Sequence, residues 1–422
     1  MVPEGSVMTS AIARITSFSQ RRSQTIALPL PGGTLLRAHG GLGGKRPPTV
    51  AYDLLDLAAT VFNLERQLTG RQRTDPVGSI ELRFPARSGR SWSKTALTLV
   101  ENVLRFLGNA QWRVSTSNRQ ASEEPELSER YSGRAKRLVL FSGGLDSWCG
   151  AAVSSRSDTR LMSFYTRQKA MQADLAADLG YPAPVQWCWR KALPRGRGRS
   201  FYYRSFLFQS LAAVTAATLG SEEILQFENG VLASAVAPSP AYRMTRHAHP
   251  HFLAMMQRLI SLLFRRDIRL HNPFVLTTKR QAAEAAKKAI GLEAAVKAIS
   301  VTQSCWGYWA PRLQGGGKKR PGKHCGVCIP CIVRRTAFPE GRYARDLTID
   351  RWKNSPACGL HFRAYHGFLE RVRDAAEDDA RFFLLLDGAA RTDLIGRGYQ
   401  SPSQLRSLYT AFADEFQETF LG

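Results

Sequence analysis

A short glycine-containing loop constrains the fold of this chain more than any other feature. Its sequence is SGGLDS, formed by Ser142, Gly143, Gly144, Leu145, Asp146 and Ser147. An apolar run at residues 138–141 precedes the loop, and a helical pattern follows it. A strand, a glycine turn and a helix in this order make the anion-binding corner of an α/β sheet. The alternative is a tight glycine turn with an Asp-Ser helix cap.

Strand and helix patterns alternate after this loop. Further strands are predicted at residues 161–165, 185–189 and 224–227, and helices at residues 148–155, 168–179 and 203–219. Strands that alternate with helices of this length indicate βαβ units and a doubly wound parallel sheet. Trp187 and Trp189 either stack on a flat base or belong to the core of this sheet.

The flanking regions have different patterns. Residues 52–68 and 93–107 have helical spacing around a strand at 80–84, and the polar stretch 116–137 is typical of a linker. Beyond about residue 340 the chain becomes helical again. We therefore expect an α/β domain at 1–135, a central domain at 136–340 and a helical extension at 341–422.

Charge and hydropathy limit the partners and the location. The formal net charge is +25, which favours anionic partners such as nucleotides, nucleic acid or an acidic protein surface. The basic segments 190–204 and 312–335 either border the active site and hold an acidic partner, or form a solvated surface. The longest apolar run, 252–264, is too short to span a bilayer, and the first thirty residues contain no secretory apolar region. We expect a cytoplasmic protein with no membrane partner.

Four cysteines have the spacing of a metal site. They are Cys305, Cys325, Cys328 and Cys331. Four thiolates close a tetrahedron around Zn²⁺ and leave no open position, which predicts a structural metal. The alternatives are that His324 replaces one ligand, or that these are unrelated buried cysteines. Cys149 lies in the first helical turn after the loop, where the pKa of a thiol is lowered and a redox role is conceivable, or it is a small core residue like Cys188 and Cys358.

The loop resembles the PP-loop of ATP pyrophosphatases. Together with the cysteine cluster it resembles the QueC family of 7-cyano-7-deazaguanine synthases over about residues 138–338. Residues 203–208 resemble the helix entry of that family, with Ser205 in place of Asn, and residues 227–230 resemble its substrate-facing loop after the fourth strand. Residues 272–279 resemble another family segment, in which Thr278 can cap a helix with Gln281 and place Lys279 in the first turn.

The resemblance implies an adenine nucleotide alpha hydrolase-like PP-loop fold with ATP, Mg²⁺ and Zn²⁺. It implies that residues 142–147 hold the pyrophosphate of ATP, that Asp146 belongs to the phosphate and Mg²⁺ site and that Ser147 is part of the catalytic loop. Lys279 and Arg204 are candidate cations for the phosphates, or surface charges. Such enzymes adenylate 7-carboxy-7-deazaguanine, so the expected activity is that of an ATP-dependent ligase that forms C–N bonds.

The two flanking regions depart from an ordinary QueC protein. The architecture most resembles the QatC family, the long QueC-like proteins of the Qat anti-phage system. This resemblance implies a protein partner from the same defence operon, whose amine would intercept the acyl adenylate. The alternatives are a free-standing 7-cyano-7-deazaguanine synthase, a PP-loop enzyme that acts on tRNA, and a non-catalytic nucleic-acid or protein-binding scaffold that keeps the fold.

Overall fold

The structure is a computed structural model in which most of the chain is described. The described residues are 10–17, 23–29, 36–39, 47–68, 77–108, 110–119, 135–164, 168–189, 202–239, 244–305, 324–341, 343, 356–386 and 401–422.

Six described strands form the central sheet, in the order β10-β9-β6-β7-β8-β3. Their bounds are β3 Leu36–His39, β6 Arg137–Leu140, β7 Thr159–Phe164, β8 Val185–Trp189, β9 Glu223–Leu225 and β10 Arg269–His271. All neighbours are parallel except β3, which runs antiparallel to β8 at the edge. The parallel sheet confirms the prediction from the alternating pattern. From β6 the chain moves outward through β7 and β8 and then returns to β9 on the other side of β6. The crevice between the carboxyl ends of β6 and β9 is therefore the switch point, where such sheets bind ligands.

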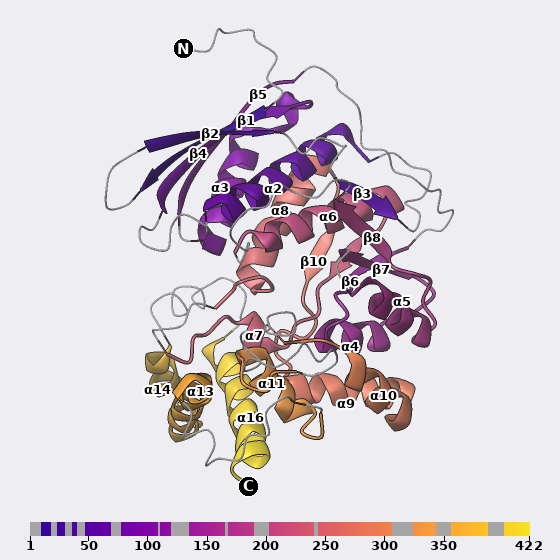
Figure 1. Ribbon diagram of the computed structural model, residues 1–422, viewed down its shortest axis with the longest axis vertical. Coiled ribbons are helices and arrows are strands. Elements are labelled where there is room, and N and C mark those ends of the chain that lie inside the picture. Colours follow the sequence, from indigo (N-terminus) through magenta and orange to yellow (C-terminus); the bar gives the residue numbers. More distant parts are fainter. Residues whose placement is uncertain are drawn as a thin grey trace.

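Helices cover both faces of this sheet (Figure 1). They are α4 Leu145–Val153, α5 Lys169–Asp178, α6 Arg204–Leu219, α8 Pro250–Phe264, α9 Lys279–Ile290 and α10 Leu292–Val301. Successive β6 residues face opposite sides: Leu138 packs with α6 and α8, and Val139 packs with α4 and α9. Gly150 allows α4 to lie close to the segment that follows β9, since a Cβ atom there would be 2.0 Å from the Phe227 ring.

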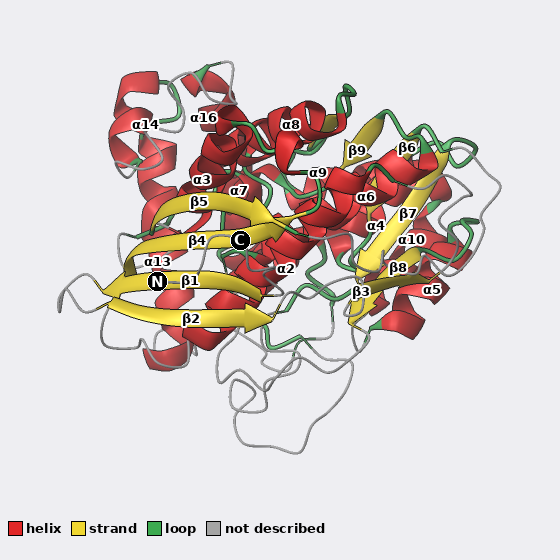
Figure 2. Ribbon diagram, turned by 90° about the horizontal axis from the view of Figure 1, so that it is seen from above, coloured by secondary structure: helices red, strands yellow, loops and turns green. Residues whose placement is uncertain are grey.

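A second sheet lies beyond α6 and α8. Its described strands have the order β2-β1-β4-β5 (Figure 2). The elements of this layer are β1 Ser10–Ser17, β2 Ser23–Pro29, α2 Thr49–Leu68, β4 Val77–Ala86, η1 Gly89–Ser91, α3 Lys94–Gly108 and β5 Gln111–Asn118. Helix α2 packs on α6 and α3 packs on α8, so one continuous core joins this layer to the central sheet.

Polar contacts fix the junction between the layers. Glu65 on α2 accepts hydrogen bonds from the backbone N–H groups of Tyr202 (2.9 Å) and Tyr203 (3.1 Å), just before α6 begins. Trp112 Nε1 on β5 donates to the Tyr203 hydroxyl at 3.0 Å. The stretch 116–137 differs from the linker prediction at both ends, because β5 continues to Asn118 and β6 begins at Arg137. Residues 120–134 lie outside the described part.

The C-terminal helices pack beside the carboxyl edge of the central sheet (Figure 1). They are α13 Pro356–Asp374, α14 Asp379–Leu385 and α16 Pro402–Phe420, and they share a core with α7 Gly230–Ala233 and α11 Ile329–Ala337. None of the described helices is long and apolar enough to cross a membrane.

Candidate functional site

The SGGLDS loop connects β6 to α4 at the switch point. Gly143 has a φ of +78°, a conformation that glycine adopts easily. The Ser142 and Ser147 hydroxyl oxygens lie 3.0 Å apart, and Ser142 Oγ accepts from the Gly144 N–H at 3.1 Å. Helix α4 has no side-chain cap, so the N–H groups of its first turn remain available to an anion.

Residues distant in sequence brace this loop. Gln172 Nε2 on α5 donates to the Ser142 carbonyl at 3.0 Å. The Gln303 N–H donates to the Gly143 carbonyl at 3.0 Å, and the Gln303 side chain accepts from Gln168 at 2.5 Å. Sequence reasoning missed these glutamines, because no motif or periodicity marks them. They hold the loop in place from the α5 side and from the segment that leads to Cys305.

Asp146 is the centre of a buried polar cluster. Its Oδ2 forms an ion pair with Lys279 Nζ, and its Oδ1 accepts from Asn229 Nδ2 at 3.2 Å. The exposed fractions are 8% for Asp146, 1% for Lys279 and 0% for Asn229. Lys279 begins α9, and Thr278 caps that helix in a capping box with Gln281 as the sequence predicted. The loop after β6, the loop after β9 and the start of α9 thus converge on one carboxylate.

Glu228 extends this cluster towards a histidine. Its Oε1 accepts from Asn229 Nδ2 at 3.0 Å, and its Oε2 lies 2.8 Å from His247 Nε2. The other ring nitrogen of His247 is 3.0 Å from the Thr245 hydroxyl. The resemblance had placed Glu228 and Asn229 in a substrate-facing loop without naming them as site residues. Nothing in the sequence pointed to His247.

The two carboxyl groups differ in acidity. Burial, opposed by the charge of Lys279 and assisted by that of Glu228, raises the pKa of Asp146 to about 6. Burial acts on Glu228 in the same direction, but His247, Lys279 and the hydrogen bond with Asp146 together outweigh burial and lower the pKa of Glu228. Asp146 is therefore the carboxylate of this site that gains a proton first as the pH falls.

Arg204 is not part of this hydrogen-bonded cluster. It begins α6 near Glu65 and is exposed, and among the described residues it forms no hydrogen bond or ion pair. Trp187 belongs to the sheet core and donates to Thr215 at 2.8 Å, whereas the Trp189 side chain lies outside the described part.

The expected lowering of the Cys149 pKa is wrong, since complete burial raises it. Desolvation is the main cause, the charge of Asp146 acts in the same direction, and Cys149 is a core residue.

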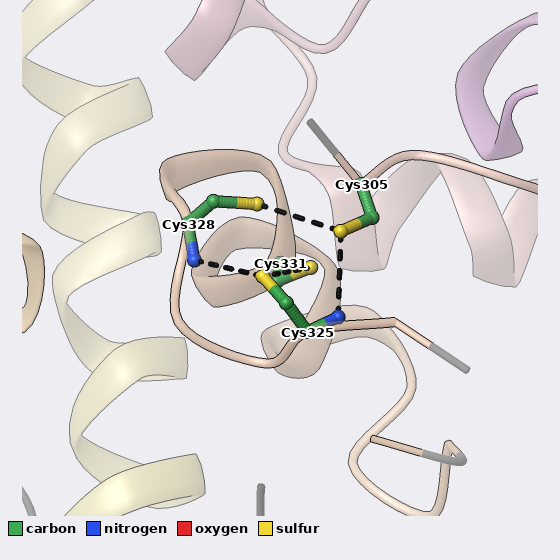
Figure 3. A group of neighbouring side chains, drawn as sticks. All are labelled: Cys305, Cys325, Cys328 and Cys331. Carbon is green, nitrogen blue, oxygen red and sulfur yellow. Dashed lines mark hydrogen bonds between the residues drawn. The ribbon is translucent and has the colours of Figure 1, made fainter. Parts of the chain in front are cut away.

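The four predicted metal ligands are close together (Figure 3). The Sγ atoms of Cys305, Cys325, Cys328 and Cys331 all lie within 4.8 Å of one another. Two of the separations are 3.8 Å and 4.0 Å, close to the spacing of about 3.8 Å that four Zn–S bonds of about 2.3 Å imply. Backbone N–H groups of residues 325, 327 and 328 donate to these sulfurs. The cluster could bind zinc, and His324 lies outside it.

Hydrogen bonds connect the cysteine cluster to the SGGLDS loop. Arg334 on α11 donates to the Thr302 hydroxyl at 2.9 Å and to the Ile299 carbonyl at 2.5 Å. His324 Nε2 accepts from the Ser304 N–H at 3.2 Å, and burial lowers the pKa of His324 to about 3, which keeps this acceptor neutral. These bonds fix the backbone on both sides of Gln303, so the cysteine cluster and the SGGLDS loop share one support.

A doubly wound parallel sheet with a glycine loop at its switch point is the arrangement in which α/β proteins bind nucleotides. Residues 200–342 match the model of the family described as queuosine biosynthesis protein QueC. The match includes Lys279, Arg204 and the four cysteines, whereas the loop precedes it. A search of curated proteins found no match. The mixed α/β fold, the parallel sheet, the cysteine cluster and the family match together support a QueC-like PP-loop enzyme of the ATP-pyrophosphatase type, which uses ATP.

Proposed function

We propose that this protein binds ATP with Mg²⁺ and adenylates the carboxylate of a 7-deazaguanine such as 7-carboxy-7-deazaguanine. The observation that carries the proposal is the convergence of Lys279 and Asn229 on Asp146, beside the uncapped start of α4. A buried lysine, a carboxylate and free N–H groups are the groups that polyphosphate with a divalent cation requires. Their position at the switch point is where this fold binds nucleotides.

Different residues of the site would bind different parts of the ATP–Mg²⁺ complex. The first-turn N–H groups of α4 and the hydroxyls of Ser142 and Ser147 suit the β- and γ-phosphates. The Asp146 carboxylate suits Mg²⁺, which neutralises phosphate charge when bound. Lys279 supplies a fixed positive charge next to the same phosphates. Arg204, exposed at the start of α6, remains a candidate for the outer part of the site.

The reaction follows from this placement. A carboxylate oxygen of the substrate attacks the α-phosphorus, the bond to the bridging oxygen breaks, and pyrophosphate leaves. Stabilising the charge on pyrophosphate lowers the barrier of this step. An amine nitrogen then attacks the acyl carbon, AMP leaves, and the nitrogen loses a proton. The net result is a new C–N bond.

The acceptor is proposed to be a macromolecule, in an anti-phage system of the QatC kind. The motivation is the extra sheet layer and the C-terminal helices around a QueC-like centre, together with the net charge of +25. A docked partner places its amine at a high effective concentration and so needs no new catalytic groups. A partner from the same defence operon, with an acidic surface, fits this charge.

The test is incubation with ATP, Mg²⁺ and 7-carboxy-7-deazaguanine, with AMP and pyrophosphate as the measured products. We expect Ser147→Ala and Asp146→Asn to lower AMP release by on the order of 100-fold. The matched control is Ser300→Ala, which changes an exposed serine on α10 and should be neutral. Normal turnover in both loop variants would exclude the PP-loop assignment.

The products then identify the acceptor. Intact-mass analysis of co-expressed neighbour proteins should show an added deazaguanine that depends on Asp146. Accumulation of free 7-cyano-7-deazaguanine alone would favour the free-standing synthase, and labelled tRNA would favour an RNA-modifying enzyme. A folded wild-type protein that releases no AMP under any of these conditions would favour the scaffold.

A further inference from the structure

Two segments of the chain hold Asp146, and we call them the arms of the site: the start of α9, with Lys279, and the segment of Asn229 and α7. The C-terminal helix α16 contacts both arms. We propose that Glu415 on α16 is a positioning residue for Lys279, and that α16 is the supporting wall of the ATP site. This rests on the proposed function, because it takes Lys279 to contact ATP phosphates.

The first contact is with the cap of α9. Thr278 Oγ1 accepts from the Gln281 N–H at 3.1 Å and donates to Glu415 Oε1 at 2.5 Å. A hydroxyl has one hydrogen, so donation to Glu415 leaves its lone pairs for Gln281. Thr278 is fully buried and Glu415 is 8% exposed, so bulk water has little access to replace this acceptor. Glu415 therefore fixes the cap that sets the direction of the first turn, where Lys279 lies.

The second contact is with the residue after Lys279. Arg280 forms an ion pair with Glu418 and donates to the Thr419 hydroxyl at 3.0 Å, both on α16. Its Nε donates to the Thr336 carbonyl on α11 at 2.6 Å. Lys279 is thus flanked on both sides by residues bound to the C-terminal helix.

The third contact is with the other arm of the site. The Tyr409 hydroxyl on α16 lies 2.9 Å from the Ser234 hydroxyl and donates to the Val231 carbonyl at 3.2 Å. Both partners belong to or adjoin α7, the short helix that Asn229 caps. A side chain at Gly230 would lie 2.6 Å from Leu408, which shows how closely α16 packs on this arm. The same helix therefore supports both hydrogen-bonding partners of Asp146.

The chemistry of Glu415 also indicates more than packing. Burial raises the pKa of its carboxyl group, because the ionised form loses hydration there. An apolar side chain would fill the same volume at a lower free-energy cost. The property that the site uses is the acceptor oxygen that Glu415 offers to Thr278.

The experiment measures calorimetric binding of ATP in the presence of Mg²⁺ to the full-length protein. Glu415→Ala should weaken binding about tenfold, in the range expected for one buried hydrogen bond to a charged group. Glu415→Gln keeps an acceptor oxygen and should restore binding to within about twofold. Asp414→Ala removes the neighbouring exposed acid of α16 and should have no effect. If the alanine variant does not fold, Glu415→Leu fills the volume without an acceptor and provides the same test.

A double-mutant cycle with Lys279→Met separates positioning from general stability. In the Lys279→Met background, Glu415→Ala should cause no further loss of ATP binding, since the group that it positions is gone. Equal loss in both backgrounds, or a glutamine variant as weak as the alanine variant, would overturn the inference while leaving the proposed function intact. A wild-type protein that binds no ATP would instead refute the proposed function, and the inference with it.

Discussion

The buried ion pair of Lys279 and Asp146 sets the chemistry of the site at the scale of single residues. Two charges in a protein interior are tolerated when each has several partners. Asp146 has Lys279 and Asn229, and Asn229 is itself shared with Glu228. The charges in this cluster interact, so the protonation of one carboxyl group depends on the others.

The binding of ATP with Mg²⁺ should therefore depend on pH. Burial raises the pKa of Asp146 to about 6, so the carboxylate that suits the cation is lost, and binding weakens, as the pH falls through about 6. In Lys279→Met the midpoint should move to higher pH, because the lysine charge lowers this pKa. Calorimetric titrations from about pH 5 to about pH 8 measure both midpoints.

The stability of the ATP-free protein should depend on pH with the opposite sign: the contribution of Asp146 to the free energy of unfolding should decrease as the pH rises. A raised native pKa stabilises the fold fully below the ordinary Asp pKa of about 4, and this contribution is lost as the pH rises through about 6. Asp146→Asn should remove this part of the pH dependence of the melting temperature. If the pH dependence of ATP binding by the wild-type protein has its midpoint at about pH 4, both expectations are wrong.

At the scale of elements, the cysteine cluster and helix α11 form a support for the SGGLDS loop. Arg334 holds the chain at residues 299 and 302, and Gln303 then bonds the Gly143 carbonyl. Any disturbance of the cluster is thereby passed to the loop through a few hydrogen bonds.

Purified protein should contain about one zinc per chain, and Cys328→Ser should remove it. We expect a fall of about 10 °C in melting temperature, because structural zinc binding is coupled to folding. ATP binding should weaken as well, since Gln303 loses its fixed position. Cys149→Ser, at a buried cysteine outside the cluster, is the control and should retain the metal. Metal-free wild-type protein with the same melting temperature would exclude a zinc site.

At Gly230, helix α7 lies in close contact with its neighbours. A Cβ atom there would lie 2.3 Å from the Val275 carbonyl oxygen. Gly230→Ala should therefore destabilise the protein by about 2 kcal/mol and displace Asn229, with lower AMP release. Gly367→Ala on α13 is the control, because a Cβ atom there meets only the end of Arg371 at 3.8 Å. Chemical denaturation of both variants tests this, and equal stability of the two would contradict the packing argument.

At the scale of the whole molecule, the two sheets pack together through four helices. Helices α2 and α3 pack on α6 and α8, and Glu65 holds the start of α6. Strand β3, which precedes α2 in the chain, lies in the central sheet beside β8. The N-terminal layer therefore supports the enzyme-like centre directly.

The two sheets should unfold together. Differential scanning calorimetry is expected to show one transition for both, because their apolar residues form a single core. Deleting residues 1–119 should give an aggregating product, since the apolar faces of α6 and α8 would become exposed. An early transition confined to the N-terminal layer would contradict this expectation.

Local patterns were enough to predict much of this protein. The strand–loop–helix unit at residues 142–147, the parallel sheet, the capping box at Thr278 and the four-cysteine cluster were all predicted from residues close in sequence. Periodicity, glycine placement and ligand spacing act over a few residues, so they can be recognised before the fold is known.

Tertiary structure alone decided which of these features meet. Asp146 and Lys279 are 133 residues apart, Thr278 and Glu415 are 137 apart, and Ser234 and Tyr409 are 175 apart. Burial likewise raised the pKa of Cys149 and of Asp146, which their positions in the sequence did not indicate. Such contacts and desolvation depend on how sheets and helices stack, and no pattern within a single segment records that packing.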